Sequence, residues 1–305
     1  MKLFKVLLLP LLLLSSDITP IPLSVEYDEK KAELGKKLFF DPILSKDNTI
    51  SCSSCHNLPG NGANSTQYSF GVNGAVGDMN SPTVLNSGFN FVQFWNGRAK
   101  DLKEQALEPI ENPLEMASKL EDAIKKLKNS AYKKEFNKIY ADGVSKDNLA
   151  DAIAEFEIAL ITPNSRFDKY LRGDNSAITL QEKRGYEKFK DFGCISCHNG
   201  VAVGGNMYQV TGLVSEYKQD KPINGRYDIT KRQRDINVYK VPSLRNIDKT
   251  APYFHDGQVE TLSDAIDEMQ VTQLGIKPKK DDTKLIESFL KTLSGDMPEI
   301  LKGLE

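Results

Sequence analysis

The chain has 305 residues, of which 39% are hydrophobic and 27% are charged, and its formal net charge is −2. This composition is ordinary for a globular protein, and the small net charge excludes a nucleic-acid binder that relies on bulk electrostatic attraction. The length predicts two domains.

The chain begins with a segment typical of export. Lys2 and Lys5 precede an apolar run from Val6 to Leu14, and small and polar residues follow it. This pattern predicts a signal peptide over residues 1–16, and therefore a periplasmic protein. A membrane anchor is the alternative, but the run is much shorter than the roughly 20 residues that span a bilayer as a helix. We therefore expect no stable insertion into a membrane.

Two helices with the same local pattern are predicted, one in each half of the chain. Glycine and phenylalanine stand four residues apart at Gly35 and Phe39, and again at Gly185 and Phe189. Such a pair lies on one helix face, where the missing side chain lets another helix approach closely. The expected partners are the helices that close each half, at 149–160 and 285–293, where apolar residues recur at helical spacing.

The segments between these helices fall into two kinds. Residues 120–140 are rich in Lys and Glu with an apolar stripe, which predicts a helix whose outer face is solvated. Residues 57–82 and 199–225 are rich in Gly, Asn, Pro and Ser, which predicts long loops. Loops held by a rigid scaffold often carry function, so these two segments are candidates to surround a site.

All four cysteines belong to two copies of one motif, Cys-x-x-Cys-His. The first copy is Cys52, Cys55 and His56, and the second is Cys194, Cys197 and His198. This is the attachment motif of c-type haem, in which two thiols bond one porphyrin and the histidine is the proximal iron ligand. A thioredoxin-like redox pair or half of a zinc site also uses Cys-x-x-Cys, but the repeated histidine favours haem.

These elements predict the fold and its division. Each half is expected to contain a helix, a haem motif, long loops and a closing helix, which is the plan of a small cytochrome c domain. The predicted class is therefore all-α, with two cytochrome c-like domains that each bind one haem covalently. A turn at 162–165 predicts the boundary, which gives an N-terminal domain at 17–164 and a C-terminal domain at 165–305.

The two motifs and three further segments resemble the bacterial dihaem cytochrome c peroxidase family. The segments are QFWNGR at 93–98, ITPNSRFD at 161–168 and APYFHDG at 251–257. The resemblance runs from about Leu34 to Gly295. It implies reduction of hydrogen peroxide with electrons from a small monohaem cytochrome c or a cupredoxin, and a homodimer is expected.

The resemblance also implies roles for individual residues. His198 and Met269 would ligate the C-terminal haem, where electrons enter, although Met207 and Met297 also lie in this half. Peroxide would react at the N-terminal haem beside Glu115 and Gln105, and Trp95 would lie between the haems. A calcium ion would bind Asn80, Thr250 and Pro252. His255 would be a structural or propionate-contacting residue rather than an iron ligand.

The chain departs from the family at one position. Many members have a capping histidine in the loop after the first motif, where this chain has Val72. We therefore expect a peroxidatic haem whose sixth position is open or filled by water without reductive activation. Capping by Met79 or Tyr68 is the competing possibility.

Two other functions are compatible with the motifs. One is a dihaem electron carrier without a substrate, which the presence of Glu115 disfavours. The other is the related dihaem enzyme that matures a tryptophan-derived quinone in another protein. That enzyme has tyrosine where the peroxidases have methionine, so Met269 favours a peroxidase.

Overall fold

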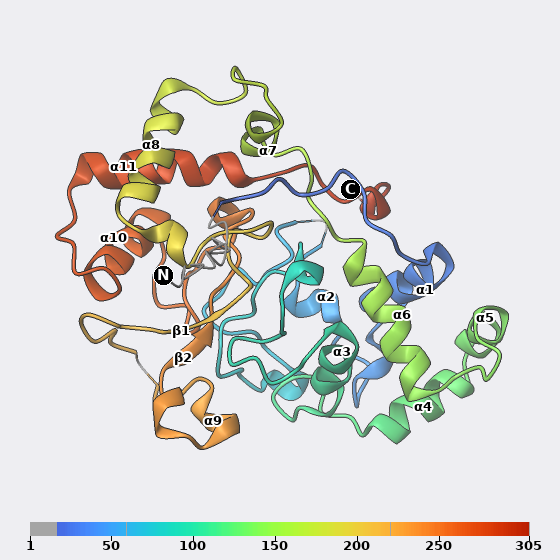
Figure 1. Ribbon diagram of the computed structural model, residues 1–305. Coiled ribbons are helices and arrows are strands. Elements are labelled where there is room, and N and C mark those ends of the chain that lie inside the picture. The colour runs from blue at the N-terminus through green and yellow to red at the C-terminus, as the bar shows by residue number, and fades with distance from the viewer. Residues whose placement is uncertain (1–16, 59, 220, 305) are drawn as a thin grey trace, which may run out of the picture.

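The computed structural model describes residues 17–58, 60–219 and 221–304. The predicted signal peptide at 1–16 lies outside these residues. The fold is helical (Figure 1), and its α-helices are α1 (Glu29–Phe40), α2 (Cys52–Cys55), α3 (Leu102–Glu111), α4 (Leu120–Lys128), α5 (Tyr132–Ile139), α6 (Lys146–Ile158), α7 (Arg166–Leu171), α8 (Leu180–Asp191), α9 (Tyr227–Thr230), α10 (Leu262–Thr272) and α11 (Lys280–Leu290). None of these helices is long and apolar enough to cross a membrane.

Short 3₁₀ helices lie in the segments between the α-helices and after α11. Their bounds are η1 (Pro42–Leu44), η2 (Val72–Gly74), η3 (Ser87–Phe89), η4 (Cys194–Ser196), η5 (Gln233–Asp235), η6 (Ile247–Lys249), η7 (Lys291–Leu293) and η8 (Glu299–Leu301). The two Cys-x-x-Cys-His motifs therefore differ locally, because α2 holds the first pair of cysteines and η4 begins at the second pair.

Two groups of helices surround separate hydrophobic cores. The first core lies among α1, α3, α4, α5 and α6 and includes the buried side chains of Leu34, Leu127 and Phe136. The second lies among α7, α8, α10 and α11 and includes Phe167 and Phe289. Figure 1 shows α4, α5 and α6 on one side of the molecule and α8, α10 and α11 on the other. The domain boundary at 164/165 stays a prediction.

Two details of the predicted elements were wrong. The segment 120–140 is not one helix, because residues 129–131 separate α4 from α5. Its apolar stripe nevertheless packs inward, with Ala123, Leu127 and Phe136 fully buried. The loop prediction at 199–225 missed β1 (Tyr208–Val210), which pairs antiparallel with β2 (Val238–Lys240). A three-residue strand is too short to leave a periodic signal in the sequence.

The glycine and phenylalanine helices dock as the sequence predicts. α1 packs against α6, and α8 packs against α11. A Cβ atom added at Gly35 would lie 1.9 Å from the carbonyl oxygen of Ala152, and one at Gly185 would lie 2.0 Å from that of Leu285. Both distances are far below van der Waals contact, so each helix crossing requires glycine. Phe39 and Phe189 are buried beside these crossings.

We expect Gly185→Ala to destabilise the protein by about 3 kcal/mol or more, because the new methyl group must push the backbone of α11 away. Gly88→Ala is the control, since its Cβ would lie 3.6 Å from the nearest atom, Ile158 Cα, in ordinary contact. Denaturant unfolding of both variants measures the difference. Equal midpoints for the two variants would contradict this account of the helix crossing.

The first described residues lie against the second half of the chain. Ile18 forms a parallel bridge with Gly200, directly after the second motif. The buried guanidinium of Arg245 donates to the carbonyl oxygen of Thr19 at 2.9 Å and to Asp168 Oδ1 at 2.8 Å. The segment then continues to α1 in the first half (Figure 1), so it joins both helix groups.

Candidate functional site

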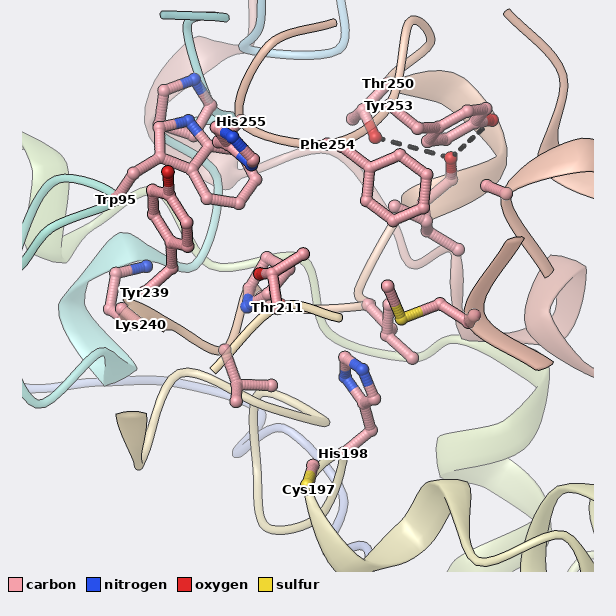
Figure 2. Close-up of a pocket in the computed structure, with 18 of the residues that line it drawn as sticks. Trp95, Cys197, His198, Thr211, Tyr239, Lys240, Thr250, Tyr253, Phe254 and His255 are labelled. Atoms are coloured by element: carbon pink, nitrogen blue, oxygen red, sulfur yellow. Dashed lines mark hydrogen bonds between the residues drawn. The ribbon is translucent and has the colours of Figure 1, made fainter. Parts of the chain in front are cut away.

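One cavity is lined by residues from both halves and has a volume of about 260 Å³, which makes it larger than the second cavity described below. Cys194, Cys197 and His198 of the second motif line it, as do Met269 and Trp95. Figure 2 shows Cys197 and His198 at one end of the cavity and Trp95 with His255 at the other. Most of the remaining lining side chains are apolar, so this cavity suits a large, flat, mainly apolar group with a few polar contacts.

One ring nitrogen of His198 faces a backbone carbonyl oxygen. Its Nδ1 lies 3.3 Å from the carbonyl oxygen of Val203, and if Nδ1 donates this hydrogen bond, Nε2 is free to bind a metal. Burial lowers the pKa of His198 to about 4, which keeps the ring neutral at physiological pH. His56 of the first motif has the same arrangement, with Nδ1 3.3 Å from the carbonyl oxygen of Gly62.

The three methionines of the second half differ in position. Met269, in α10, lines the larger cavity together with His198, whereas Met207 and Met297 do not line it. The side chain of Met297 is exposed. Among these three, Met269 is therefore the thioether placed to share a cavity with the histidine of the second motif.

The smaller cavity gathers the predicted peroxide-site residues. Cys52, Cys55 and His56 line it together with Gln105 and Glu115. The cysteines of both motifs form no disulfide. Burial raises the pKa of the Cys52 thiol, and it raises that of Cys194 to about 11. The volume is about 40 Å³, so a porphyrin fits here only if the surrounding side chains move apart.

Glu115 has the environment of a proton-transfer group. Burial raises the pKa of its carboxyl group, although the Asn112 amide and the nearby charge of Arg98 oppose this shift. Asn112 Nδ2 donates to Glu115 Oε1 at 2.6 Å, which fixes the carboxyl group in the cavity. A buried carboxyl group whose pKa is raised above its ordinary value is suited to accept and return a proton.

The loop that contains Val72 packs directly on the segment of Glu115. The amide nitrogen of Val72 donates to the carbonyl oxygen of Glu115 at 2.8 Å, and Val72 is buried. A Cβ atom at the preceding Gly71 would lie 2.2 Å from the carbonyl oxygen of Leu114. Tyr68 and Met79, the two competing capping residues, are not among the residues that line the smaller cavity.

Trp95 lies in an aromatic group at the junction of the halves. Its Nε1 donates to the carbonyl oxygen of Asn80 at 2.8 Å, and its ring centroid lies 6.3 Å from that of His255. His255 stacks on Tyr239 with centroids 4.1 Å apart, and its Nε2 lies 2.9 Å from Gln219 Oε1. These contacts hold the indole ring on the wall of the larger cavity.

The three predicted calcium residues come together on the same cavity. Asn80, Thr250 and Pro252 all line it, although Asn80 lies 170 or more positions before the other two in the sequence. The amide nitrogen of Asn80 donates to the carbonyl oxygen of His255 at 2.8 Å, which joins the two segments. The described residues contain no group of three or more His, Cys, Asp or Glu side chains that could hold a metal ion. A cation here would therefore depend on amide, hydroxyl and carbonyl oxygens.

Two buried ionisable residues that line the cavities were not predicted from the sequence. Glu157 lines the smaller cavity, its Oε2 has no hydrogen-bond partner among the described residues, and burial raises its pKa to about 8. Lys240 lines the larger cavity and is 6% exposed. Glu157 lies four residues after Ile153 on the buried face of α6. A charged residue within the apolar stripe of a predicted helix is the sequence signal that could have identified it.

Comparison with known proteins defines the class. The family model for di-haem cytochrome c peroxidase matches residues 29–176. A cytochrome c551 peroxidase of Nitrosomonas europaea is 49% identical over 92% of this chain and 85% of its own. A cytochrome c551 peroxidase of Pseudomonas aeruginosa is 45% identical, and the match covers 89% of this chain and 81% of that protein. The chain belongs to the di-haem cytochrome c peroxidase family, and it is an oxidoreductase of the peroxidase type.

The fold agrees with this assignment. The crystal structure of a MauG-like protein associated with microbial copper homeostasis superposes with a TM-score of 0.79, at 27% identity. The match covers 92% of this chain and 94% of that protein. Both halves of the chain therefore share the architecture of this structural relative.

Proposed function

We propose that the chain binds one haem c covalently at each Cys-x-x-Cys-His motif and reduces hydrogen peroxide to water. The strongest support is that the larger cavity brings His198 and Met269 together with both cysteines of the second motif. Two thiols, a neutral imidazole and a thioether fit haem c, and each half of the fold then forms a cytochrome c-like domain. Bound haem supplies the electron-transfer and peroxide chemistry.

Electrons are proposed to enter at the C-terminal site. A methionine ligand raises the potential of haem iron, which suits His198 and Met269 to receiving electrons from a donor. The donor is expected to be a small monohaem cytochrome c or a cupredoxin. Trp95 lies on the cavity wall away from His198 (Figure 2), and its ring is proposed to shorten the electron path toward the N-terminal site.

Peroxide is proposed to react beside Glu115 and Gln105. Hydrogen peroxide takes up two electrons and two protons and yields two waters. Glu115 accepts the proton of the near oxygen and returns it to the far oxygen, so that water leaves rather than hydroxide. Gln105 lines the same cavity and can donate a hydrogen bond to the bound peroxide.

The sixth position at His56 is proposed to be open in the oxidised protein. Val72 has no ligating atom, and its loop is already packed on the segment of Glu115. Turnover would then need no prior reduction of the other haem. Low-temperature electron paramagnetic resonance of the oxidised protein checks this, because two low-spin haems with no high-spin signal would contradict an open position.

Three further properties complete the proposal. Asn80, Thr250 and Pro252 would hold a calcium ion through oxygen ligands, which suit a hard cation. The mature protein would act in the periplasm as a homodimer. Calcium removal by a chelator, with metal analysis before and after, tests the first property, and sedimentation of the mature protein tests the last.

A haem count with a turnover assay tests the central proposal. We expect two haems per chain by the pyridine haemochrome assay, and the Cys194→Ser/Cys197→Ser variant should retain one. The reduced protein should be oxidised rapidly by peroxide, and a reduced cytochrome c should sustain turnover. Two haems without oxidation by peroxide would indicate the electron carrier instead. That function and quinone maturation are less supported, because relatives at 45–49% identity are named peroxidases.

A further inference from the structure

Lys240 is a buried cation in the wall of the larger cavity. It is the last residue of β2, is 6% exposed, and its amide nitrogen donates to the carbonyl oxygen of Trp95 at 2.7 Å. The strand pairing of β2 with β1 fixes its backbone. Figure 2 shows Lys240 beside Tyr239 on the Trp95 side of the cavity, away from Cys197 and His198.

The charge of Lys240 has no counter-charge within the described protein. Its ammonium group forms no ion pair or hydrogen bond with a described residue. Among the described residues that line the cavity there is no Asp, Glu or Arg, and Lys240 is the one lysine. Burial lowers the pKa of Lys240 to about 8. A buried ammonium without a partner is costly, so a residue placed in this way fits an anionic ligand group.

The haem of the proposed function carries such a group. Its vinyl edge would be bonded to Cys194 and Cys197, and its two propionate carboxylates leave the opposite edge of the porphyrin. Lys240 lies on the side of the cavity away from Cys197 (Figure 2). We propose that Lys240 pairs with a propionate of the C-terminal haem, an inference that rests on the proposed covalent attachment at the second motif.

The pair would have two effects on the haem. It would orient the propionate edge toward Trp95, because the Lys240 amide is hydrogen-bonded to the Trp95 carbonyl group. It would also add a positive charge near the iron in a cavity of low polarity, which stabilises the ferrous over the ferric state. Lys240 is thus a positioning residue that holds the potential of the electron-entry haem high.

Redox titration of the holoprotein tests this pair. Lys240→Met keeps the length of the side chain and removes the charge. We expect it to shift the ferric/ferrous equilibrium of the high-potential haem about tenfold toward the ferric state, which lowers the potential by about 59 mV. Lys240→Arg should retain most of the wild-type potential. Lys249→Met is the matched control, because Lys249 is exposed beside cavity residues Ile247 and Thr250, and its shift should be less than twofold.

The outcomes separate this inference from the proposed function. If the haem count shows no haem at the second motif, the proposed function itself fails. If both haems are present and Lys240→Met leaves the potentials unchanged, or shifts only that of the N-terminal haem, the pairing is wrong. Methionine preserves the packing of the side chain but not its charge, so an unchanged potential would mean that Lys240 acts through packing alone. A structure of the wild-type holoprotein gives a second measurement that needs no variant. A Lys240 Nζ within about 4 Å of a propionate oxygen supports the pair, and a longer separation contradicts it.

Discussion

Glu115→Gln is expected to lower peroxide turnover by about 10²- to 10⁴-fold, the usual contribution of a positioned acid–base group. Glutamine keeps the shape and the hydrogen bond from Asn112 Nδ2, because its carbonyl oxygen can accept it in place of Glu115 Oε1. It cannot accept a proton at neutral pH. Steady-state turnover with a reduced cytochrome c measures the loss, and the absorption spectra of both haems should be retained.

The control for this prediction is Glu121→Gln. Glu121 is an exposed residue of the first turn of α4 in the same half of the chain, and it does not line either cavity. Turnover of this variant should stay within about twofold of the wild-type rate, as for surface changes far from a site. If Glu115→Gln behaved like Glu121→Gln, proton transfer by Glu115 would have to be abandoned.

Val72→His is expected to make the oxidised enzyme dependent on prior reduction. The Val72 amide is hydrogen-bonded to the Glu115 carbonyl oxygen, so the new imidazole would lie next to the proposed peroxide site. If it occupied the iron in 99% of molecules, the initial rate of the fully oxidised protein would fall about 100-fold. Stopped-flow rates before and after one-electron reduction measure the dependence.

Val72→Leu separates ligation from packing in this experiment. Leucine disturbs the buried position of Val72 but offers no ligating atom. We expect this variant to react with peroxide in the oxidised state, as is proposed for the wild-type protein. If the wild-type oxidised protein were itself inactive until reduced, the open sixth position would be wrong whatever the variants did.

The elements that the sequence predicted well are those with local signals. The Cys-x-x-Cys-His motifs are contiguous in the sequence. Gly35 and Gly185 each stand four residues before a phenylalanine on one helix face, so the docking of these two helices could be predicted. Met269 needed the family resemblance, because nothing local distinguishes it from Met207 or Met297. Its place on the cavity beside His198 is a tertiary feature.

The missed features depend on contacts between distant segments. Lys240 is buried because β2 pairs with β1 and because its amide binds Trp95, 145 positions away. A lysine in the sequence is most often exposed, so its burial cannot be read locally. Glu157 differs in part, because its place on the apolar stripe of α6 could be read from the sequence. Only the packing of α6 on α1 shows that its carboxyl group faces the first motif.

The segment at 17–21 has a consequence for the order of folding. It is synthesised before either helix group, yet its contacts are with Gly200, Asp168 and Arg245. Those residues follow at least 147 positions later in the chain, so the beginning of the described chain cannot reach its native place until most of the protein is present. Residues 17–21 therefore stay without their native contacts while the first half folds. They bind beside the second Cys-x-x-Cys-His motif only when the second half is complete.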